Sequence, residues 1–170
     1  MKTLYLLRHA KSSWDYPGLA DFDRPLNGRG HETAPFMGDL MRVKAYRPSL
    51  VLSSPAVRAR TTAELVKEAA NLAAEIRFDE RIYEASPTTL LSVVSETDDS
   101  IPAAMIVGHN PGIEGFVRLL TGQNEAMPTA ALAVIGLPID SWRSVDSDSG
   151  ELEAIYRPKE VRMEMSAEHR

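Results

Sequence analysis

Apolar runs that alternate with helical patterns are the feature that most constrains the fold of this chain. The runs 4–7, 50–52 and 103–107 are each short enough to be buried strands, and each is followed by a helical pattern. Strands that alternate with helices are joined by right-handed crossovers and form a mainly parallel sheet with helices on both faces. We therefore expect an α/β fold, specifically a three-layer α/β/α architecture with a mainly parallel sheet.

Capping signals indicate where the helices begin and end. Asn27 is a favourable N-cap for a first helix, whose apolar residues follow at helical spacing. Ser54 and Pro55 are typical of a cap followed by proline at the first helical position, and this second helix is expected to run to about Ala70. A third helix should end near Gly122.

The last third of the chain contains fewer clear signals. Residues 129–137 read as a fourth strand, and residues 152–156 as a possible edge strand after a turn. A length of 170 residues favours one domain, 1–170, because one core suffices for a chain of this size.

Composition excludes several classes of protein. With 44% hydrophobic and 25% charged residues and a mean hydropathy of -0.22, the chain can bury a core and does not resemble a disordered segment. No apolar stretch approaches the ~20 residues that span a bilayer, and residues 1–10 lack a long apolar export segment. We therefore expect a cytoplasmic protein that does not bind membranes.

Cysteine content and net charge narrow the chemistry further. The chain has no cysteine, which excludes disulfides, thiolate metal ligands and a cysteine nucleophile. A net charge of -5 argues against a broad electrostatic grip on nucleic acid. Positive charge that matters for function must therefore be local.

Local positive charge does gather where the predicted strands end. Arg8 and His9 follow the first apolar run, His109 follows the third, and Arg58 falls in the first turn of the second helix. In open α/β sheets the ligand crevice lies beyond the carboxyl ends of the strands. Two arginines, two histidines and a helix amino terminus at one point make an anion pocket suited to phosphate.

Each of these residues also has an ordinary structural interpretation. A single histidine after a strand is most often a hydrogen-bonded structural residue, and an arginine in a first turn usually faces solvent. We interpret the remaining histidines in this way, His31 as a solvated residue of a first turn and His169 as part of a carboxyl-terminal tail. The functional interpretation depends on the combination of residues.

The sequence leaves a metal site as an alternative. Asp21 and Asp23 could bind a metal ion together with His9 and His109. An acidic turn that fixes Arg24 is the interpretation we prefer, so we expect no metal.

Five stretches, in this order, resemble the histidine phosphatase superfamily, and specifically its SixA-type phosphohistidine phosphatase branch. They are "LYLLRHAKSSW", "DFDRPLNGRG", "LSSPAVRARTTAE", "IYEAS" and "VGHNPGIE", and together they cover nearly the whole chain. The superfamily signature Arg-His-Gly reads here Arg8-His9-Ala10, a variant that is similar to the SixA-type subset. The resemblance implies a phosphoglycerate mutase-like fold.

The resemblance also implies a role for each residue of the site. His9 matches the nucleophile that accepts the phosphoryl group, and Glu84 resembles the acid of the branches that cleave phosphate esters. The residues that would bind phosphate are Arg8, Arg58, His109 and, as an accessory arginine, Arg24.

The function that we expect is a metal-independent phosphohistidine phosphatase without a cofactor. It would remove phosphate from a phosphorylated protein or peptide through a covalent phosphohistidine intermediate on the enzyme. The chain has little room for the insertions that close over small metabolites in larger members of the superfamily. Two alternatives stay open: a phosphatase for a small phosphoester, favoured if Glu84 is a competent acid, and a phosphate-binding module without turnover.

Overall fold

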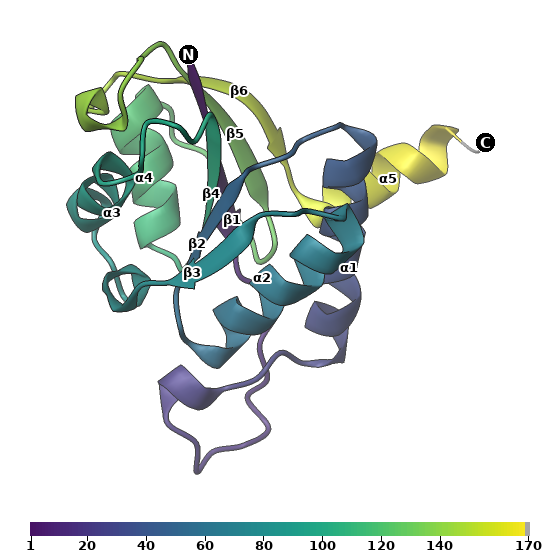
Figure 1. Ribbon diagram of the computed structural model, residues 1–170. Coiled ribbons are helices and arrows are strands. Elements are labelled where there is room, and N and C mark those ends of the chain that lie inside the picture. Colours follow the sequence, from purple (N-terminus) through teal and green to yellow (C-terminus); the bar gives the residue numbers. More distant parts are fainter. Residues whose placement is uncertain (169–170) are drawn as a thin grey trace.

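A six-stranded sheet forms the centre of the computed structural model, which describes residues 1–168 (Figure 1). His169 lies outside the described residues. The strands stand in the order β3-β2-β4-β1-β5-β6. Their bounds are Lys2–Arg8 for β1, Leu50–Ser53 for β2, Glu75–Phe78 for β3, Ala103–Gly108 for β4, Leu132–Leu137 for β5 and Glu151–Tyr156 for β6.

Strand direction divides the sheet into two parts. β1 pairs in parallel with β4, and β2 pairs in parallel with both β4 and β3. β5 and β6 run antiparallel to their neighbours and complete the sheet beyond β1. A strand is confirmed within each of the predicted ranges 129–137 and 152–156, but β5 begins only at Leu132, after a turn at 129–130. β6 is an edge strand as expected, whereas β3 at the opposite edge carries no clear sequence signal.

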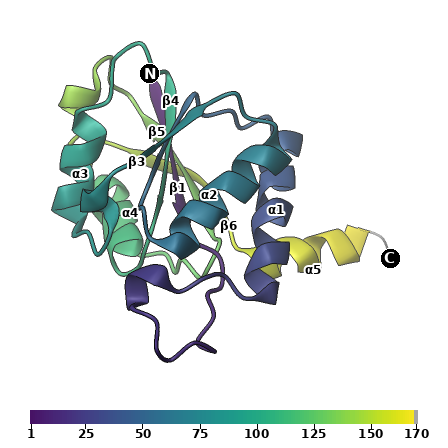
Figure 2. The same ribbon diagram turned by 60° about the horizontal axis from the view of Figure 1, so that its bottom comes forward.

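Helices cover both faces of the sheet, which confirms the predicted three-layer architecture (Figures 1 and 2). α1 and α2 pack side by side on one face, and α3 and α4 pack on the other. Their bounds are Gly28–Val43 for α1, Val57–Ala70 for α2, Pro87–Ser95 for α3 and Gly112–Thr121 for α4. A fifth helix, α5 (Pro158–Glu168), follows β6 and lies beside α1. None of the helices within residues 1–168 is long and apolar enough to cross a bilayer.

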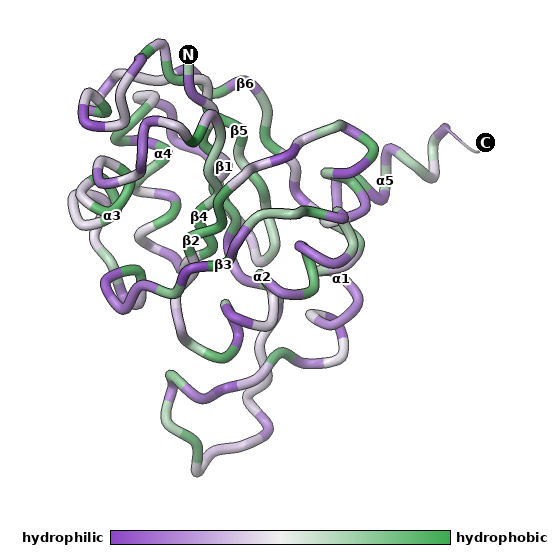
Figure 3. Tube along the Cα trace, viewed as in Figure 1, coloured by the Kyte–Doolittle hydropathy of each residue, from purple (hydrophilic) through white to green (hydrophobic). Residues whose placement is uncertain are grey.

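Alternation along β1 shows how the two helical layers are held. Successive side chains of a strand point to opposite faces. Leu4 and Leu6 belong to the apolar core under α3 and α4, while Tyr5 and Leu7 belong to the core under α1 and α2. The central strands are therefore hydrophobic along most of their length (Figure 3).

The helix ends agree with the capping signals in two cases and differ in one. Asn27 caps α1 by accepting a hydrogen bond from the Gly30 amide at 2.9 Å, and Gly122 is the C-cap that follows the last residue of α4, Thr121. The predicted cap at Ser54 is wrong, because α2 starts at Val57. The Ser54 amide donates instead to the Val107 carbonyl of β4 at 3.0 Å, which keeps this residue in line with the sheet.

Candidate active site

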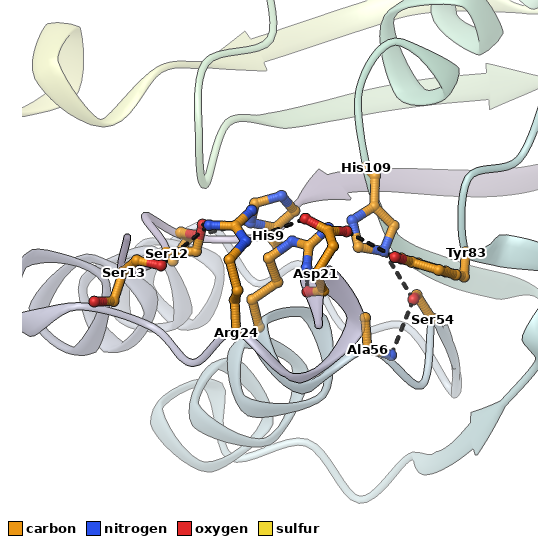
Figure 4. Close-up of polar contacts among 11 residues, drawn as sticks. His9, Ser12, Ser13, Asp21, Arg24, Ser54, Ala56, Tyr83 and His109 are labelled. Atoms are coloured by element: carbon orange, nitrogen blue, oxygen red, sulfur yellow. Dashed lines mark hydrogen bonds and ion pairs between the residues drawn. The ribbon is translucent and has the colours of Figure 1, made fainter. Parts of the chain in front are cut away.

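His9 and His109 stand side by side because two parallel strands end at the same level. Arg8, the last residue of β1, is paired in register with Gly108, the last residue of β4. The His9 amide then donates to the Gly108 carbonyl at 3.0 Å, and the two imidazole rings lie with centroids 5.1 Å apart. The structure thus brings together the two histidines that the sequence placed at strand ends (Figure 4).

The arginines expected at this point also lie in or beside the cluster, with Arg58 buried and Arg8 half-buried. Arg58 lies in the first turn of α2 and its side chain is 7% exposed. Arg8 donates from Nη1 to the Met127 carbonyl at 3.1 Å, and burial lowers the pKa of its guanidinium. The charges of Arg58 and Arg8 both act on His9.

Backbone geometry determines which nitrogen of His9 carries the proton. His9 Nδ1 lies 2.7 Å from the Ala10 carbonyl oxygen, which can only accept a hydrogen bond. Nδ1 is therefore the protonated nitrogen, and Nε2 carries the free lone pair. Burial lowers the pKa of His9 to about 4, with a further contribution from the charges of Arg58 and Arg8. His9 is thus a neutral imidazole of defined tautomer near neutral pH.

His109 is neutral as well, but it faces the site with the other nitrogen. Burial, together with His9 and Arg58, lowers its pKa to about 3. His109 Nε2 lies 2.8 Å from the hydroxyl oxygen of Ser54. The Ser54 oxygen also accepts a hydrogen bond from the Ala56 amide at 3.2 Å, and within residues 1–168 His109 Nε2 is the only acceptor in reach of the buried Ser54 hydroxyl hydrogen, so we assign this hydrogen to the bond with Nε2. The remaining proton of the ring is then on Nδ1.

Three buried donors of the cluster have no hydrogen-bond partner within residues 1–168. They are Arg8 Nε, Arg58 Nε and His109 Nδ1. Buried polar groups are nearly always paired, so a group of unpaired donors needs a physical explanation. Donors of this kind, two of them charged, would be satisfied by the oxygens of an anion. The arrangement is chemically suited to phosphate.

Asp21 is a residue of this site that the sequence reading assigned only in part. The expectation that an acidic turn fixes Arg24 is met, since Asp21 Oδ1 accepts from Arg24 Nε at 3.1 Å. Asp21 Oδ2 also accepts from Arg58 Nη2 at 2.9 Å and from the Tyr83 hydroxyl at 2.7 Å, and the Asp21 carbonyl accepts from Arg58 Nη1 at 2.6 Å. The bond from Tyr83, followed by those from the arginines, lowers the pKa of the Asp21 carboxyl. Asp21 therefore orients Arg58 as an ionised carboxylate.

Arg24 is anchored around the same loop. Its Nη1 donates to the Ser12 hydroxyl at 2.9 Å and to the Ser13 carbonyl at 3.1 Å, and its guanidinium lies 3.6 Å from the centre of the Trp14 ring. Arg24 is 8% exposed, and its charge contributes to the low pKa of His9. The structure thus places Arg24 next to the site, held mainly by the loop.

Tyr83, rather than Glu84, is the residue of the "IYEAS" stretch that contacts the cluster. Its ring meets that of His109 edge-on at 5.4 Å between centroids. Glu84 is exposed, has a φ of 54°, and forms no hydrogen bond or ion pair within the described residues. The sequence reading missed Tyr83 because a carboxylate is the more obvious acid.

The predicted alternative of a metal site finds no support in the geometry. Within residues 1–168, no three histidine, aspartate or glutamate side chains lie together in a way that could hold a metal ion. Asp21 is paired with arginines, and His31 is exposed on α1, as expected.

Comparison with known proteins places these features in a family. The sequence profile of the histidine phosphatase superfamily (branch 1) matches residues 4–90. The uncharacterized protein ML1117 of Mycobacterium leprae is 32% identical over 166 residues, covering 90% of this chain and 100% of that protein. The uncharacterized protein Rv1276c of Mycobacterium tuberculosis is 30% identical over 165 residues, with the same coverage of both chains.

Solved structures agree with this assignment. A crystal structure from Agrobacterium tumefaciens, described as a candidate phosphohistidine phosphatase SixA, is 33% identical, has a TM-score of 0.80, and covers 92% of this chain and 98% of that one. A protein histidine phosphatase SixA complexed with tungstate has a TM-score of 0.82 and covers 94% of this chain and 99% of that one. Because the two sequences are only 20% identical, this match supports the shared fold and nothing beyond it. The fold is phosphoglycerate mutase-like, and the chain belongs to the histidine phosphatase superfamily.

Proposed function

We propose that this chain is a phosphohistidine phosphatase that acts on a phosphorylated protein or peptide through a phosphohistidine intermediate at His9. One observation carries the proposal: a neutral His9 with a free Nε2 lone pair lies among three buried donors that lack partners in the described part of the chain, namely Arg8 Nε, Arg58 Nε and His109 Nδ1. A binding module would need the donors but not the oriented lone pair. We extend the proposal to one domain covering 1–170 and keep the cytoplasmic location expected from the sequence.

The first step transfers the phosphoryl group to the enzyme. His9 Nε2 attacks the phosphorus in line with the leaving imidazole, so that a new P–N bond forms as the substrate's P–N bond breaks. The electron pair of the broken bond stays on the leaving nitrogen, and the substrate imidazole departs neutral if its other nitrogen carries a proton. The hydrogen bond from His9 Nδ1 to Ala10 keeps the attacking lone pair on Nε2 throughout.

The second step regenerates His9. A water molecule attacks phospho-His9, the P–N bond breaks, and the electron pair returns to Nε2. The water's two protons pass to the released phosphate or to solvent.

Positive charge and hydrogen bonds stabilise the transferring group in both steps. Arg8 and Arg58 supply fixed positive charge. The neutral His109 donates a hydrogen bond from Nδ1 to the transferring group without adding a further charge. These groups can fulfil the role that magnesium has in many other phosphotransferases, so the proposed mechanism is independent of metal.

The environment of Glu84 favours phosphohistidine over a phosphoester. An alkoxide leaving group needs a proton from a positioned acid, whereas the imidazole of phosphohistidine leaves more readily. Glu84 is exposed and makes no hydrogen bond that would hold it toward the cluster within the described residues. The small-phosphoester alternative therefore requires Glu84 to move into the site.

Turnover of a substrate panel tests the proposal. Purified protein is assayed in excess chelator against a phosphohistidine peptide, free phosphohistidine and several phosphoesters. We expect a kcat/KM on the phosphohistidine peptide at least ten times that on any ester. A clear preference for one ester would replace the proposal by the small-phosphoester alternative. Binding of phosphate without any turnover would assign the chain as a binding module, and loss of activity in chelator would disprove metal independence.

A further inference from the structure

A basic groove lies beside the catalytic cluster, between the start of α1 and one side of α5. Its volume is about 800 Å³, and its lining contains four basic side chains, Lys11, Arg29, Lys159 and Arg162. Among residues 1–168, no aspartate or glutamate lines it. We call this feature the basic groove.

The charge of the basic groove stands out against the rest of the chain. The protein has a net charge of -5, so four basic side chains in one groove are not what the overall composition would lead one to expect. All four side chains are exposed, and none of them forms an ion pair with a carboxylate within residues 1–168. By contrast, Arg157, directly before α5, is paired with Glu125 and Glu160. The cations of the groove are therefore available to an anionic partner.

Contacts between the helices hold part of the basic groove in a defined shape. Arg162 lies over the Phe36 ring at 4.8 Å and donates to the Thr33 hydroxyl at 3.4 Å. The same hydroxyl donates to the Arg29 carbonyl at 2.8 Å. This chain of contacts links α5 to the first turns of α1, where Arg29 lies.

The groove is continuous with the catalytic cluster through the backbone. Lys11 lies two residues after His9, and its carbonyl accepts a hydrogen bond from the Asn27 amide at 3.0 Å, just before α1. On the other side, the Ala130 amide donates to the carbonyls of Arg8 and His9 at 3.1 and 3.0 Å, and the preceding residue Thr129 lines the groove. The backbone segments on both sides of His9 therefore also line the groove, which places the groove near the nucleophile.

We propose that the basic groove binds an acidic segment of the phosphorylated protein substrate, next to the phosphohistidine in its sequence or on its surface. This inference rests on the proposed function and adds a substrate class, namely phosphoproteins with acidic residues near the phosphorylated histidine. Opposite charges across such an interface raise association rates and set specificity, with a modest gain in affinity for each exposed pair. Nucleic acid fits less well, because the net charge of -5 repels a long polyanion outside the groove.

The test compares three phosphohistidine peptides of equal length, with neutral residues, with acidic residues before the phosphohistidine, or with acidic residues after it. For the wild-type protein, one acidic peptide should have a kcat/KM about tenfold above that of the neutral peptide, mainly through KM, and added salt should reduce the difference. The double variant Lys159→Gln/Arg162→Gln should remove this preference. Turnover of free phosphohistidine should not change, because neither residue touches the cluster.

A matched control removes the same amount of charge elsewhere. Arg42 in the last turn of α1 and Lys44 directly after this helix are both exposed, and Arg42→Gln/Lys44→Gln should keep the preference for the acidic peptide. Equal kcat/KM for the acidic and neutral peptides, or equal losses in the two double variants, would overturn the inference.

A binding measurement separates this inference from the proposed function. Fluorescence anisotropy with His9→Ala protein reports peptide affinity without turnover, so a preference for the acidic peptide that depends on Lys159 and Arg162 supports the groove even if no phosphohistidine is hydrolysed. Turnover of phosphohistidine without such a preference would disprove the groove while leaving the proposed function intact. Binding of an oligonucleotide of matched charge more tightly than the acidic peptide, again lost in the double variant, would also overturn the inference.

Discussion

Ser54 and His109 form a buried pair in which a hydroxyl determines the tautomer of an imidazole. Ser54 Oγ lies 2.8 Å from His109 Nε2 and also accepts a hydrogen bond from the Ala56 amide. Since the low pKa of His109 keeps its ring neutral, the ring has one proton, and the Ser54 hydroxyl directs that proton to Nδ1. Ser54 is therefore a positioning residue that acts through His109.

The variant Ser54→Ala tests this relationship. Without the hydroxyl, His109 can keep its proton on Nε2 and turn a lone pair toward the bound phosphate. We expect kcat to fall about tenfold, the value of one hydrogen bond of about 1.4 kcal/mol. Nitrogen-15 NMR of the imidazoles should show an increased Nε2–H population for His109.

The neighbouring variant Ser53→Ala is the control, because Ser53 is equally buried and donates to the Ser54 carbonyl rather than to a histidine. An unchanged His109 tautomer in Ser54→Ala would contradict the assignment.

Arg58 should not tolerate replacement by lysine. Both terminal nitrogens of its guanidinium donate to Asp21, while its buried Nε has no partner within residues 1–168. Lysine has a single ammonium group and cannot reproduce this planar arrangement of three donor nitrogens. We expect Arg58→Lys to lower kcat/KM by about 10²-fold or more, in the range of a lost oxyanion donor. Arg60→Lys is the matched control on the same helix, since Arg60 is exposed, forms an ion pair with Glu64 and lies over the Phe78 ring, away from Asp21. Comparable activity of the two variants would place Arg58 outside the phosphate site.

The two buried histidines make stability depend on pH. The pKa of His9 is lowered from 6.5 to about 4, so the folded state binds fewer protons than the unfolded state between these values. The contribution of the neutral His9 to the free energy of unfolding is therefore complete above pH 6.5 and is lost as the pH falls toward 4. For His9 this loss amounts to about 3 kcal/mol.

Urea unfolding between pH 7 and pH 4 measures this loss of stability. An NMR titration of the imidazole rings shows which histidine takes up a proton. Both rings should remain neutral at pH 5.5. A protonated His9 or His109 ring in the folded protein at that pH would contradict the buried, neutral pair.

Glu84→Gln separates the two classes of substrate. If Glu84 acts as a general acid for phosphoesters, its loss should reduce their hydrolysis by roughly 10²–10⁴-fold, while hydrolysis of phosphohistidine should change much less. The ratio of the two losses in kcat/KM is the quantity to measure, with exposed Glu80→Gln as the control. Equal losses on both substrates would mean that Glu84 shapes the site without donating a proton, and no loss on either would leave it a surface residue.

The parts of the fold that could be predicted from sequence are those with strong local signals. β1, β2 and β4 are buried on both faces and are therefore continuous apolar runs, and Asn27 and Gly122 mark helix ends through their capping preferences. β3 has the sequence Glu-Ile-Arg-Phe and is largely exposed at the sheet edge, so its pattern is weak. α5 contains many charged residues and few buried ones, so the side of this helix that packs against α1 can be recognised only once that partner is known.

The site was predictable only to the extent that strand ends indicate it. Arg8, His9 and His109 follow directly from the ends of parallel strands, but the contacts of Asp21 with Arg58 and Tyr83 span 37 and 62 residues of sequence. Such contacts depend on how a loop folds back over the sheet, for which no local signal exists. Ser54 illustrates the same limit, because a good N-cap residue is used instead to orient His109.

The most direct test of the account is to trap the phosphorylated enzyme. Brief incubation with a labelled phosphohistidine peptide, followed by an alkaline quench and peptide mapping, should give an acid-labile label on His9 that is absent in His9→Ala. The label should disappear on longer incubation as phosphate is released. A label on His109, or complete turnover with no label on His9 at any time, would contradict covalent transfer to His9.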